Sequence, residues 1–220
     1  EVLRLHLGSS KADARNRAIE LLRKVRIADA ERRFAQYPHE LSGGMNQRVM
    51  IAMAIACEPQ IIIADEPTTA LDVTIQAQVL HLLMELRESF GTAIILITHD
   101  LAVVAETADR VAVMYAGRIV ETASVADLFA CPSHPYTLGL LRSIPGTGAV
   151  PSSRDGGMLA EIPGLVPALI REFPGCAFAD RCTHVRPYCR EQRPPLVDHG
   201  NGHSVACWEY DTVTRAAGHG

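Results

Sequence analysis

Two short, continuous apolar runs constrain this chain more than any other feature of its sequence. Residues 61–64 and 93–97 are entirely aliphatic, a pattern typical of strands that are buried on both faces. Between them, residues 75–90 carry apolar side chains at helical spacing. The order strand, helix, strand predicts an α/β fold with a mostly parallel sheet covered by helices.

The remaining segments add further helices, a hairpin and a tail. We expect helices at 12–33, 45–56 and 101–108, and strands at 111–115 and 118–122 around a tight turn. From Pro145 to Ser153 the chain is rich in Pro, Gly and Ser, which indicates a linker. Beyond it lies a proline- and cysteine-rich tail without clear periodicity. The expected domains are therefore 1–145, a linker at 146–160, and an extension at 161–220.

Composition excludes several classes of protein. Apolar residues make up 48% of the chain and charged residues 21%, a balance that allows a buried core. The net charge of −4 gives no basic field for nucleic acid. No apolar run approaches the length of about 18 residues that a membrane-spanning helix needs, and the first thirty residues lack the apolar core of a signal peptide. We expect a chain that is cytoplasmic or held at a membrane by partners.

Three polar motifs flank the apolar runs. Asp65 and Glu66 end the first run, where sheets of this class bind ligands. One carboxylate could hold Mg²⁺ and the other could orient a water that attacks a phosphate. Ser42-Gly43-Gly44 opens a predicted helix and could bind an anion. His99 follows the second run and could reach the same phosphate. Taken singly, each motif is more simply a solvated turn, a helix cap or a structural histidine.

Together these motifs resemble the ATP-binding-cassette family. The segment LSGGMNQR (41–48) matches the family signature, IIIADE (61–66) the Walker B strand, ALD (70–72) the D-loop, and THD (98–100) the switch histidine. The resemblance covers about residues 1–145. It implies a P-loop NTPase-type fold with part of a helical subdomain, and a head-to-tail dimer.

The resemblance also implies ATP and Mg²⁺ as ligands and a role for each matched position. Asp65 would hold Mg²⁺, Glu66 would be the catalytic base, and His99 would contact the γ-phosphate. Nucleotide bound on the opposite subunit would be contacted by Ser42, Gly43, Gly44 and Gln47, and Asp72 would lie at the dimer interface.

One expected element is missing from the sequence. No segment matches G-x-x-x-x-G-K-[ST], the loop that cradles phosphates, and the glutamine loop is also absent. We therefore expect an N-terminally truncated chain that binds ATP poorly by itself. The ATPase activity would belong to the intact protein.

Two features indicate the branch of the family. HPYTL at 134–138 and the cysteine-rich tail resemble the extension of dipeptide and oligopeptide importer ATPases. This implies a peripheral subunit at the cytoplasmic face of the membrane. Its partners would be a second ATPase subunit, integral permease subunits and an extracytoplasmic solute-binding protein, without nucleic acid. A nickel or other small-solute importer is the alternative. A non-transport cassette ATPase is less favoured, since neither a coiled-coil insertion nor a basic tail is present.

Four cysteines crowd the tail at the spacing C-x5-C-x6-C-x17-C: Cys176, Cys182, Cys189 and Cys207. Four thiolates suit either Zn²⁺ or a [4Fe–4S] cluster. The absence of C-x2-C pairs favours the cluster, which some members of the branch carry. The alternative is four buried side chains that pin a loop-rich tail. A metal-dependent nucleic-acid module is disfavoured, because residues 176–210 hold four arginines against four acidic residues. Cys57 and Cys131 are expected to be packing residues or free thiols.

Overall fold

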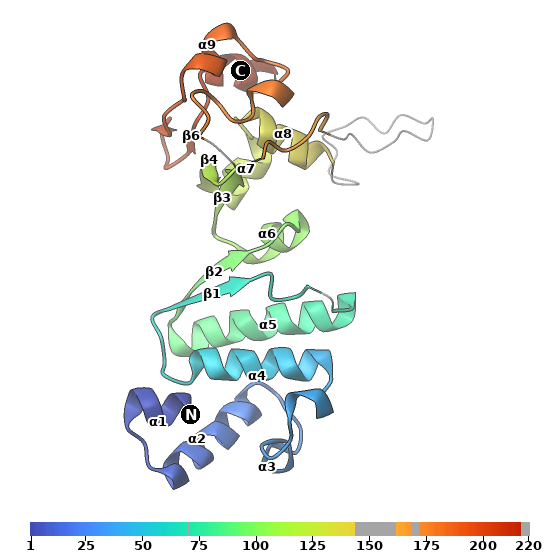
Figure 1. Cartoon of the computed structure of the whole chain (residues 1–220), viewed down its shortest axis with the longest axis vertical. Coiled ribbons are helices and arrows are strands. Elements are labelled where there is room, and N and C mark those ends of the chain that lie inside the picture. Colours follow the sequence, from blue (N-terminus) through green and yellow to red (C-terminus); the bar gives the residue numbers. More distant parts are fainter. Residues whose placement is uncertain (70, 144–161, 169–171, 217–220) are drawn as a thin grey trace. The chain divides into compact units, whose positions relative to one another are not determined.

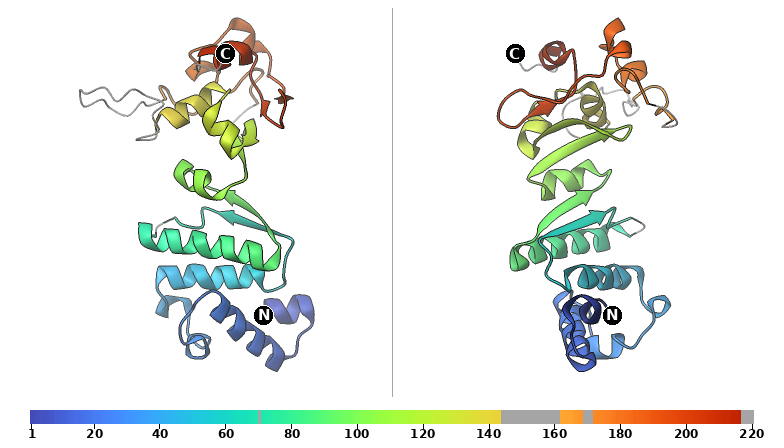
Figure 2. Two further views of the ribbon diagram at one scale, coloured as in Figure 1. Left: turned by 180° about the vertical axis from the view of Figure 1, so that it is seen from behind. Right: turned by 60° about the vertical axis from the view of Figure 1, so that its left-hand side comes forward.

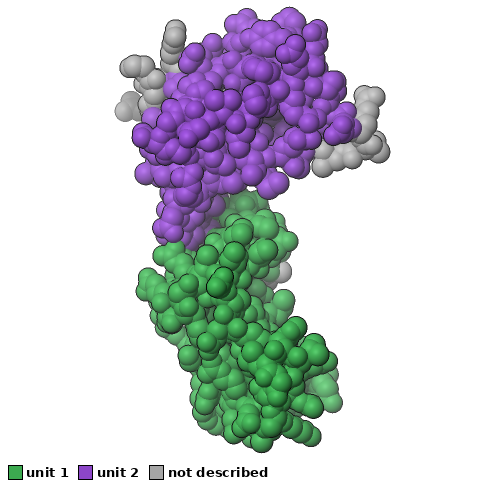
Figure 3. Space-filling model, turned by 90° about the vertical axis from the view of Figure 1, so that its left-hand side faces the viewer, with its two compact units in different colours: residues 1–100 green, residues 101–220 purple. Residues whose placement is uncertain are grey.

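The computed structural model describes residues 1–69, 71–143, 162–168 and 172–216 (Figure 1). Ala70 of the D-loop segment and the predicted linker at 146–160 lie outside these residues. The chain divides into two compact units, Glu1–Asp100 and Leu101–Gly220 (Figure 3). We call them unit 1 and unit 2 and describe each by itself. None of the helices in the described ranges is long and apolar enough to cross a membrane.

Unit 1 begins with helices, which differ in part from those predicted. They are α1 (Val2–Leu7), α2 (Lys11–Lys24), α3 (Ala30–Arg33), a 3-10 turn η1 (Pro38–Glu40), α4 (Gly43–Ile55) and α5 (Val73–Phe90). The single helix predicted at 12–33 is wrong. Arg26 and Asp29 adopt left-handed backbone angles, with φ of 62° and 51°, and thereby separate α2 from α3.

The core of unit 1 lies among these helices. In both views of Figure 2, α4 and α5 lie side by side, and their facing residues belong to one hydrophobic cluster. The predicted apolar face of α5 is confirmed, because its members are at most 6% exposed: Val79, Leu82, Leu83 and Leu86. Gly91 ends α5 with a φ of 62°, as its position after the last helical residue predicts.

The two apolar runs form a parallel pair of strands, β1 (Ile61–Asp65) and β2 (Ala93–Ile97). The parallel direction is confirmed, but burial on both faces is wrong. Ile62 and Ala64 belong to the core, whereas the alternate isoleucines of the pair are 47–66% exposed: Ile61, Ile63, Ile95 and Ile97. The reason is that the core of unit 1 packs against one face of the pair only.

The described part of unit 2 contains an antiparallel hairpin, short helices and two further short strands. In chain order they are α6 (Leu101–Thr107), β3 (Arg110–Tyr115), β4 (Arg118–Ser124), α7 (Val125–Ala130), α8 (Pro135–Arg142), η2 (Ala179–Arg181), α9 (Pro187–Glu191), β5 (Val197–Asp198), β6 (Ser204–Val205) and α10 (Tyr210–Ala216). The predicted hairpin is confirmed. Its turn places Ala116 and Gly117 at φ of 50° and 75°, in the left-handed region.

Strands from the tail complete the sheet of unit 2. The order is β3-β4-β6-β5, and Glu121 of β4 pairs with Val205 of β6 in antiparallel register. The chain is thus an α/β protein, but only one pair of the described strands is parallel. The predicted domain boundaries stay a prediction. The hairpin of the first expected domain and two strands of the expected extension nevertheless share one sheet.

Candidate functional site

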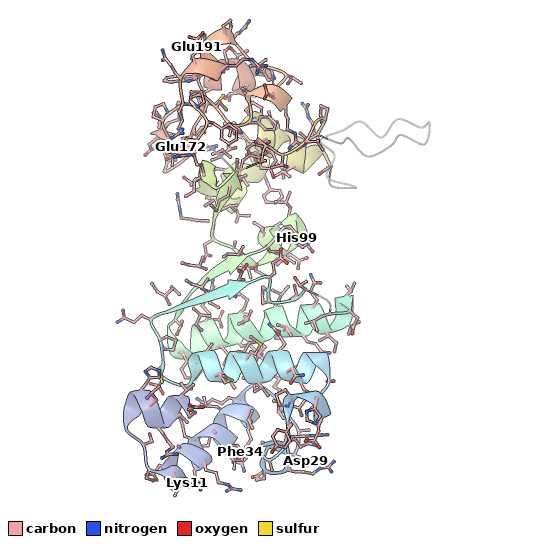
Figure 4. The ribbon with its side chains drawn as sticks, viewed as in Figure 1. Lys11, Asp29, Phe34, His99, Glu172 and Glu191 are labelled. Carbon is pink, nitrogen blue, oxygen red and sulfur yellow. The ribbon has the colours of Figure 1, made fainter. Side chains whose placement is uncertain are left out.

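The ends of β1 and β2 bring three predicted residues together. Asp65 pairs with Ile97 in the parallel register, so the residues that follow both strands lie at one edge. The Glu66 amide donates to the Ile97 carbonyl at 2.9 Å. His99 lies just beyond β2 (Figure 4), and its Nδ1 is 3.1 Å from Glu66 Oε1. The register of two strands therefore places a carboxylate and an imidazole in hydrogen-bond contact.

Glu66 is held in an unusual conformation by a residue that sequence reasoning missed. Its backbone angle φ of 43° is rare for a residue other than glycine. Thr69 Oγ1 donates to Glu66 Oε2 at 2.8 Å, and the Thr69 amide donates to the Glu66 carbonyl at 3.2 Å. The Thr69 hydroxyl and, second, the His99 ring lower the pKa of Glu66 below its ordinary value. Glu66 is consequently a carboxylate whose two oxygens both accept hydrogen bonds.

The segment 42–47 forms a separate group at the start of α4. Ser42 is the N-cap residue, and its Oγ accepts from the Met45 amide at 3.4 Å. A Cβ on Gly44 would lie 2.8 Å from Ile75 Cγ2, so glycine lets the first turn of α4 approach α5 closely. Within the described part of the chain, no hydrogen bond or ion pair joins this segment to Asp65, Glu66 or His99.

The start of α5 contributes a cap and a link to the segment after β2. Asp72 Oδ1 accepts from the Ile75 amide at 2.9 Å and so caps α5. Gln76 Nε2 donates to Asp100 Oδ2 at 3.4 Å. Asp72 is exposed, and its predicted place at a dimer interface stays a prediction.

In unit 2 the four tail cysteines line one small cavity, of about 20 Å³, which we call the thiol cavity. All four are free thiols. The Cys176 amide donates to the Cys189 carbonyl at 2.7 Å and ties two parts of the wall together. Burial raises the pKa of Cys176 and Cys182, and that of Cys207 to about 12. Without a bound cation, these three thiols are therefore neutral.

The thiol cavity does not have the geometry of a site for one metal ion. Among the described residues, no group of three or more His, Cys, Asp or Glu could hold a metal ion. Four thiolates on one zinc stand about 3.8 Å apart, since each Zn–S bond is about 2.3 Å and the arrangement is tetrahedral. The four cysteines thus share a cavity without converging on one point.

The HPY segment forms another part of the cavity wall. His134 lines the cavity and is 1% exposed. As N-cap of α8, its Nδ1 accepts from the Tyr136 amide at 3.1 Å. Burial lowers the pKa of His134 to about 4. This histidine is therefore neutral at ordinary pH, with its proton on Nε2.

A buried carboxylate behind His134 was also missed from the sequence. Glu121 is fully buried, and its Oε1 accepts from the Ser133 amide at 2.7 Å and from His203 Nε2 at 2.8 Å. Its Oε2 accepts from the His134 amide at 2.9 Å. One side chain of β4 thereby joins the HPY segment to the turn before β6. No local pattern in the sequence singles out Glu121 for this role.

Two family models match parts of this chain. Residues 3–69 match the model described as "ABC transporter", and residues 120–189 match "Oligopeptide/dipeptide transporter, C-terminal region". Among solved structures, the dimeric post-hydrolysis state of the ATP-binding cassette MJ0796 bound to ADP and Pi is 36% identical. The similarity covers 53% of this chain and 49% of that one, with a TM-score of 0.46.

Curated relatives match nearly the whole chain. A probable peptide ABC transporter ATP-binding protein of Sinorhizobium fredii is 56% identical over 97% of this chain and 62% of its own length. The oligopeptide transport ATP-binding protein AppD of Bacillus subtilis is 53% identical over 96% of this chain and 63% of its own length. The dipeptide transport ATP-binding protein DppD of Escherichia coli is 49% identical over 94% of this chain and 62% of its own length. The chain thus spans less than two thirds of each of these relatives. Over most of its length the chain is similar to ATP-binding-cassette transporter ATPases, and over residues 120–189 it is similar to the C-terminal region of the oligopeptide/dipeptide transporters.

Proposed function

We propose that this protein, in its whole form, hydrolyses ATP to energise the import of dipeptides or oligopeptides. The observation that carries the proposal is the hydrogen bond between Glu66 and His99 at the paired ends of β1 and β2. The names of the relatives support a peptide as cargo. A P-loop NTPase-type core is part of the proposal.

In this proposal the strand ends carry out the chemistry. Glu66 orients the attacking water and accepts its proton, and its lowered pKa keeps it ionised for that task. His99 contacts the γ-phosphate. Asp65 is an exposed carboxylate beside Glu66, which suits an oxygen ligand of Mg²⁺. The ion, when bound, would neutralise charge on the phosphates.

The signature segment would act on nucleotide held by a second subunit. Ser42, Gly43, Gly44 and Gln47 are not bonded to the strand ends of their own chain, which supports a role in trans. The first turn of α4, a helix of 13 residues, supplies amides and a dipole suited to an anion. Asp72 would lie at the same dimer interface. The other partners would be permease subunits and an extracytoplasmic binding protein, with this subunit at the cytoplasmic membrane face.

The Glu66→Gln variant of the whole protein tests the chemistry. We expect steady-state hydrolysis to fall by about two to four orders of magnitude, as for loss of a general base. ATP binding should persist, because Asp65 remains. Glu88→Gln, an exposed change on α5, is the matched control. Hydrolysis within a few-fold of the unmodified protein would remove Glu66 from its role.

Mixing two inactive variants tests the trans arrangement. A Ser42→Arg subunit combined with an Asp65→Asn subunit should retain one intact composite site and recover part of the activity. Each variant alone should be inactive. No recovery in the mixture would contradict the head-to-tail assignment.

Cargo is tested in cells that depend on this transporter. The Glu66→Gln strain should lose uptake of a labelled dipeptide and keep uptake of ⁶³Ni²⁺. The opposite result would replace the peptide assignment with a nickel importer.

We further propose that the thiol cavity holds a [4Fe–4S] cluster with a structural role. Four cysteines lining one cavity are the donor set of such a cluster. The spacing of these cysteines, which includes no C-x2-C pair, favours the cluster over a single zinc ion. Protein purified without oxygen should be brown and contain iron and sulfide, and Cys182→Ser should remove both. Cys131→Ser, a free thiol elsewhere in unit 2, is the control. Stoichiometric zinc without iron would replace the cluster with a zinc site.

A further inference from the structure

His134 is the histidine most firmly fixed in the wall of the thiol cavity. Its amide donates to Glu121, its ring packs 5.8 Å from the Phe178 ring, and it is 1% exposed. It reaches the cavity from the N-terminus of α8, far in sequence from the cysteines. These contacts fix the position of the His134 ring in the wall of the cavity.

The hydrogen bond at Nδ1 determines which ring nitrogen of His134 carries the proton. Nδ1 accepts the Tyr136 amide at 3.1 Å, so the proton of the neutral ring is on Nε2. Histidines that ligate metals show the reverse arrangement, because they donate a proton from the nitrogen that is not bound to the metal. The remaining polar atom of the ring, Nε2, has no hydrogen-bond partner among the described residues and carries the proton, so it is left as a donor.

We propose that His134 donates its Nε2–H to a sulfur atom of the group held in the thiol cavity and is a positioning residue for that group. The inference rests on the metal group of the preceding section and assigns it a partner outside the four cysteines. Hydrogen bonds to sulfur stabilise the more negative, reduced state of an iron–sulfur cluster and so set its reduction potential.

The test replaces the ring without removing the helix cap. In His134→Asn the side-chain oxygen can still accept the Tyr136 amide, since Asn is among the best N-cap residues. The Nε2–H donor is lost. His199→Asn is the matched control, because His199 is an exposed histidine of unit 2 that does not line the cavity. All proteins are purified whole and without oxygen, and their iron, sulfide and midpoint potentials are measured.

We expect both variants to keep their iron and only His134→Asn to become harder to reduce. At a fixed potential its ratio of reduced to oxidised cluster should fall about tenfold, which corresponds to about 59 mV for a one-electron couple. An unchanged potential in iron-loaded His134→Asn would overturn the inference and leave the cluster assignment intact.

Other outcomes separate the two proposals. Unmodified protein with zinc and no iron refutes the cluster. His134 is then tested by the rate at which a chelator removes zinc, which should rise severalfold in His134→Asn and stay unchanged in His199→Asn. Equal rates overturn the inference, and unmodified protein without any metal overturns both proposals. If His134→Asn does not fold, ¹⁵N NMR of the unmodified protein decides the matter, because a proton on Nδ1 of His134 overturns the inference.

Discussion

The substitution Glu121→Gln tests the buried network of unit 2 with almost no change in shape. The carboxylate accepts three hydrogen bonds, two at Oε1 and one at Oε2. An amide keeps one oxygen and replaces the other with an NH₂ group, which cannot accept. The oxygen should face Ser133 and His203, because that orientation preserves two bonds, and the His134 amide then faces a donor.

A buried donor left without an acceptor costs about 1–3 kcal/mol. Since 1.4 kcal/mol corresponds to a factor of ten, this cost should accelerate hydrogen exchange of the affected amide by about 5- to 150-fold. Hydrogen exchange followed by NMR should show this acceleration at the His134 amide. The Ser133 amide should stay closer to its original rate. Thr122→Val, on the neighbouring position of β4, should leave both rates unchanged.

Two results would refute this reasoning. If both amides exchange as slowly as in the unmodified protein, Glu121 does not hold them. If the Ser133 amide is accelerated more than the His134 amide, the side-chain amide of Glu121→Gln has adopted the orientation with fewer hydrogen bonds. The description of three accepted bonds is then wrong.

Two further predictions concern the thiol cavity and the strand ends. In Gly175→Ala the new Cβ would lie 2.4 Å from the Cys189 carbonyl oxygen and 2.5 Å from the Arg190 carbonyl, so the backbone must shift. The metal content per protein, measured by elemental analysis, should fall, and full loading would contradict the geometry. In Thr69→Val the pKa of Glu66 should rise, because the hydroxyl that contributes most to its lowering is removed. The acid limb of kcat/KM against pH should therefore move to higher pH, and Thr69→Ser should restore it; an unmoved limb in Thr69→Val would argue against the contact.

Local patterns were sufficient for part of this structure. The helix α5 and the strands β1 and β2 follow from periodicity and from continuous apolar runs, which depend only on neighbouring residues. The meeting of Glu66 with His99 could also be predicted, because parallel strands end at one edge. These elements share the property that no distant segment is needed to define them.

The features that sequence reasoning missed depend on distant or conformational partners. The strand β6 has two residues, and its pairing with β4 has no local signal. The bond from Thr69 to Glu66 accompanies a left-handed backbone at a residue that is not glycine. The exposed face of β1 and β2 could not be foreseen either, since a run of isoleucines is the same whether one face or both are covered.

The pairing of β4 with β6 also sets an order of events during synthesis. Val205 is made 84 residues after its partner Glu121. At roughly 5–20 residues per second, β4 leaves the ribosome about 4–17 s before the strand that covers its edge. During that interval the hairpin has an open edge, and Glu121 lacks the histidine that later completes its hydrogen bonds. Chains stalled before residue 204 would present this edge to one another, so interrupted synthesis should yield aggregates that begin at β4.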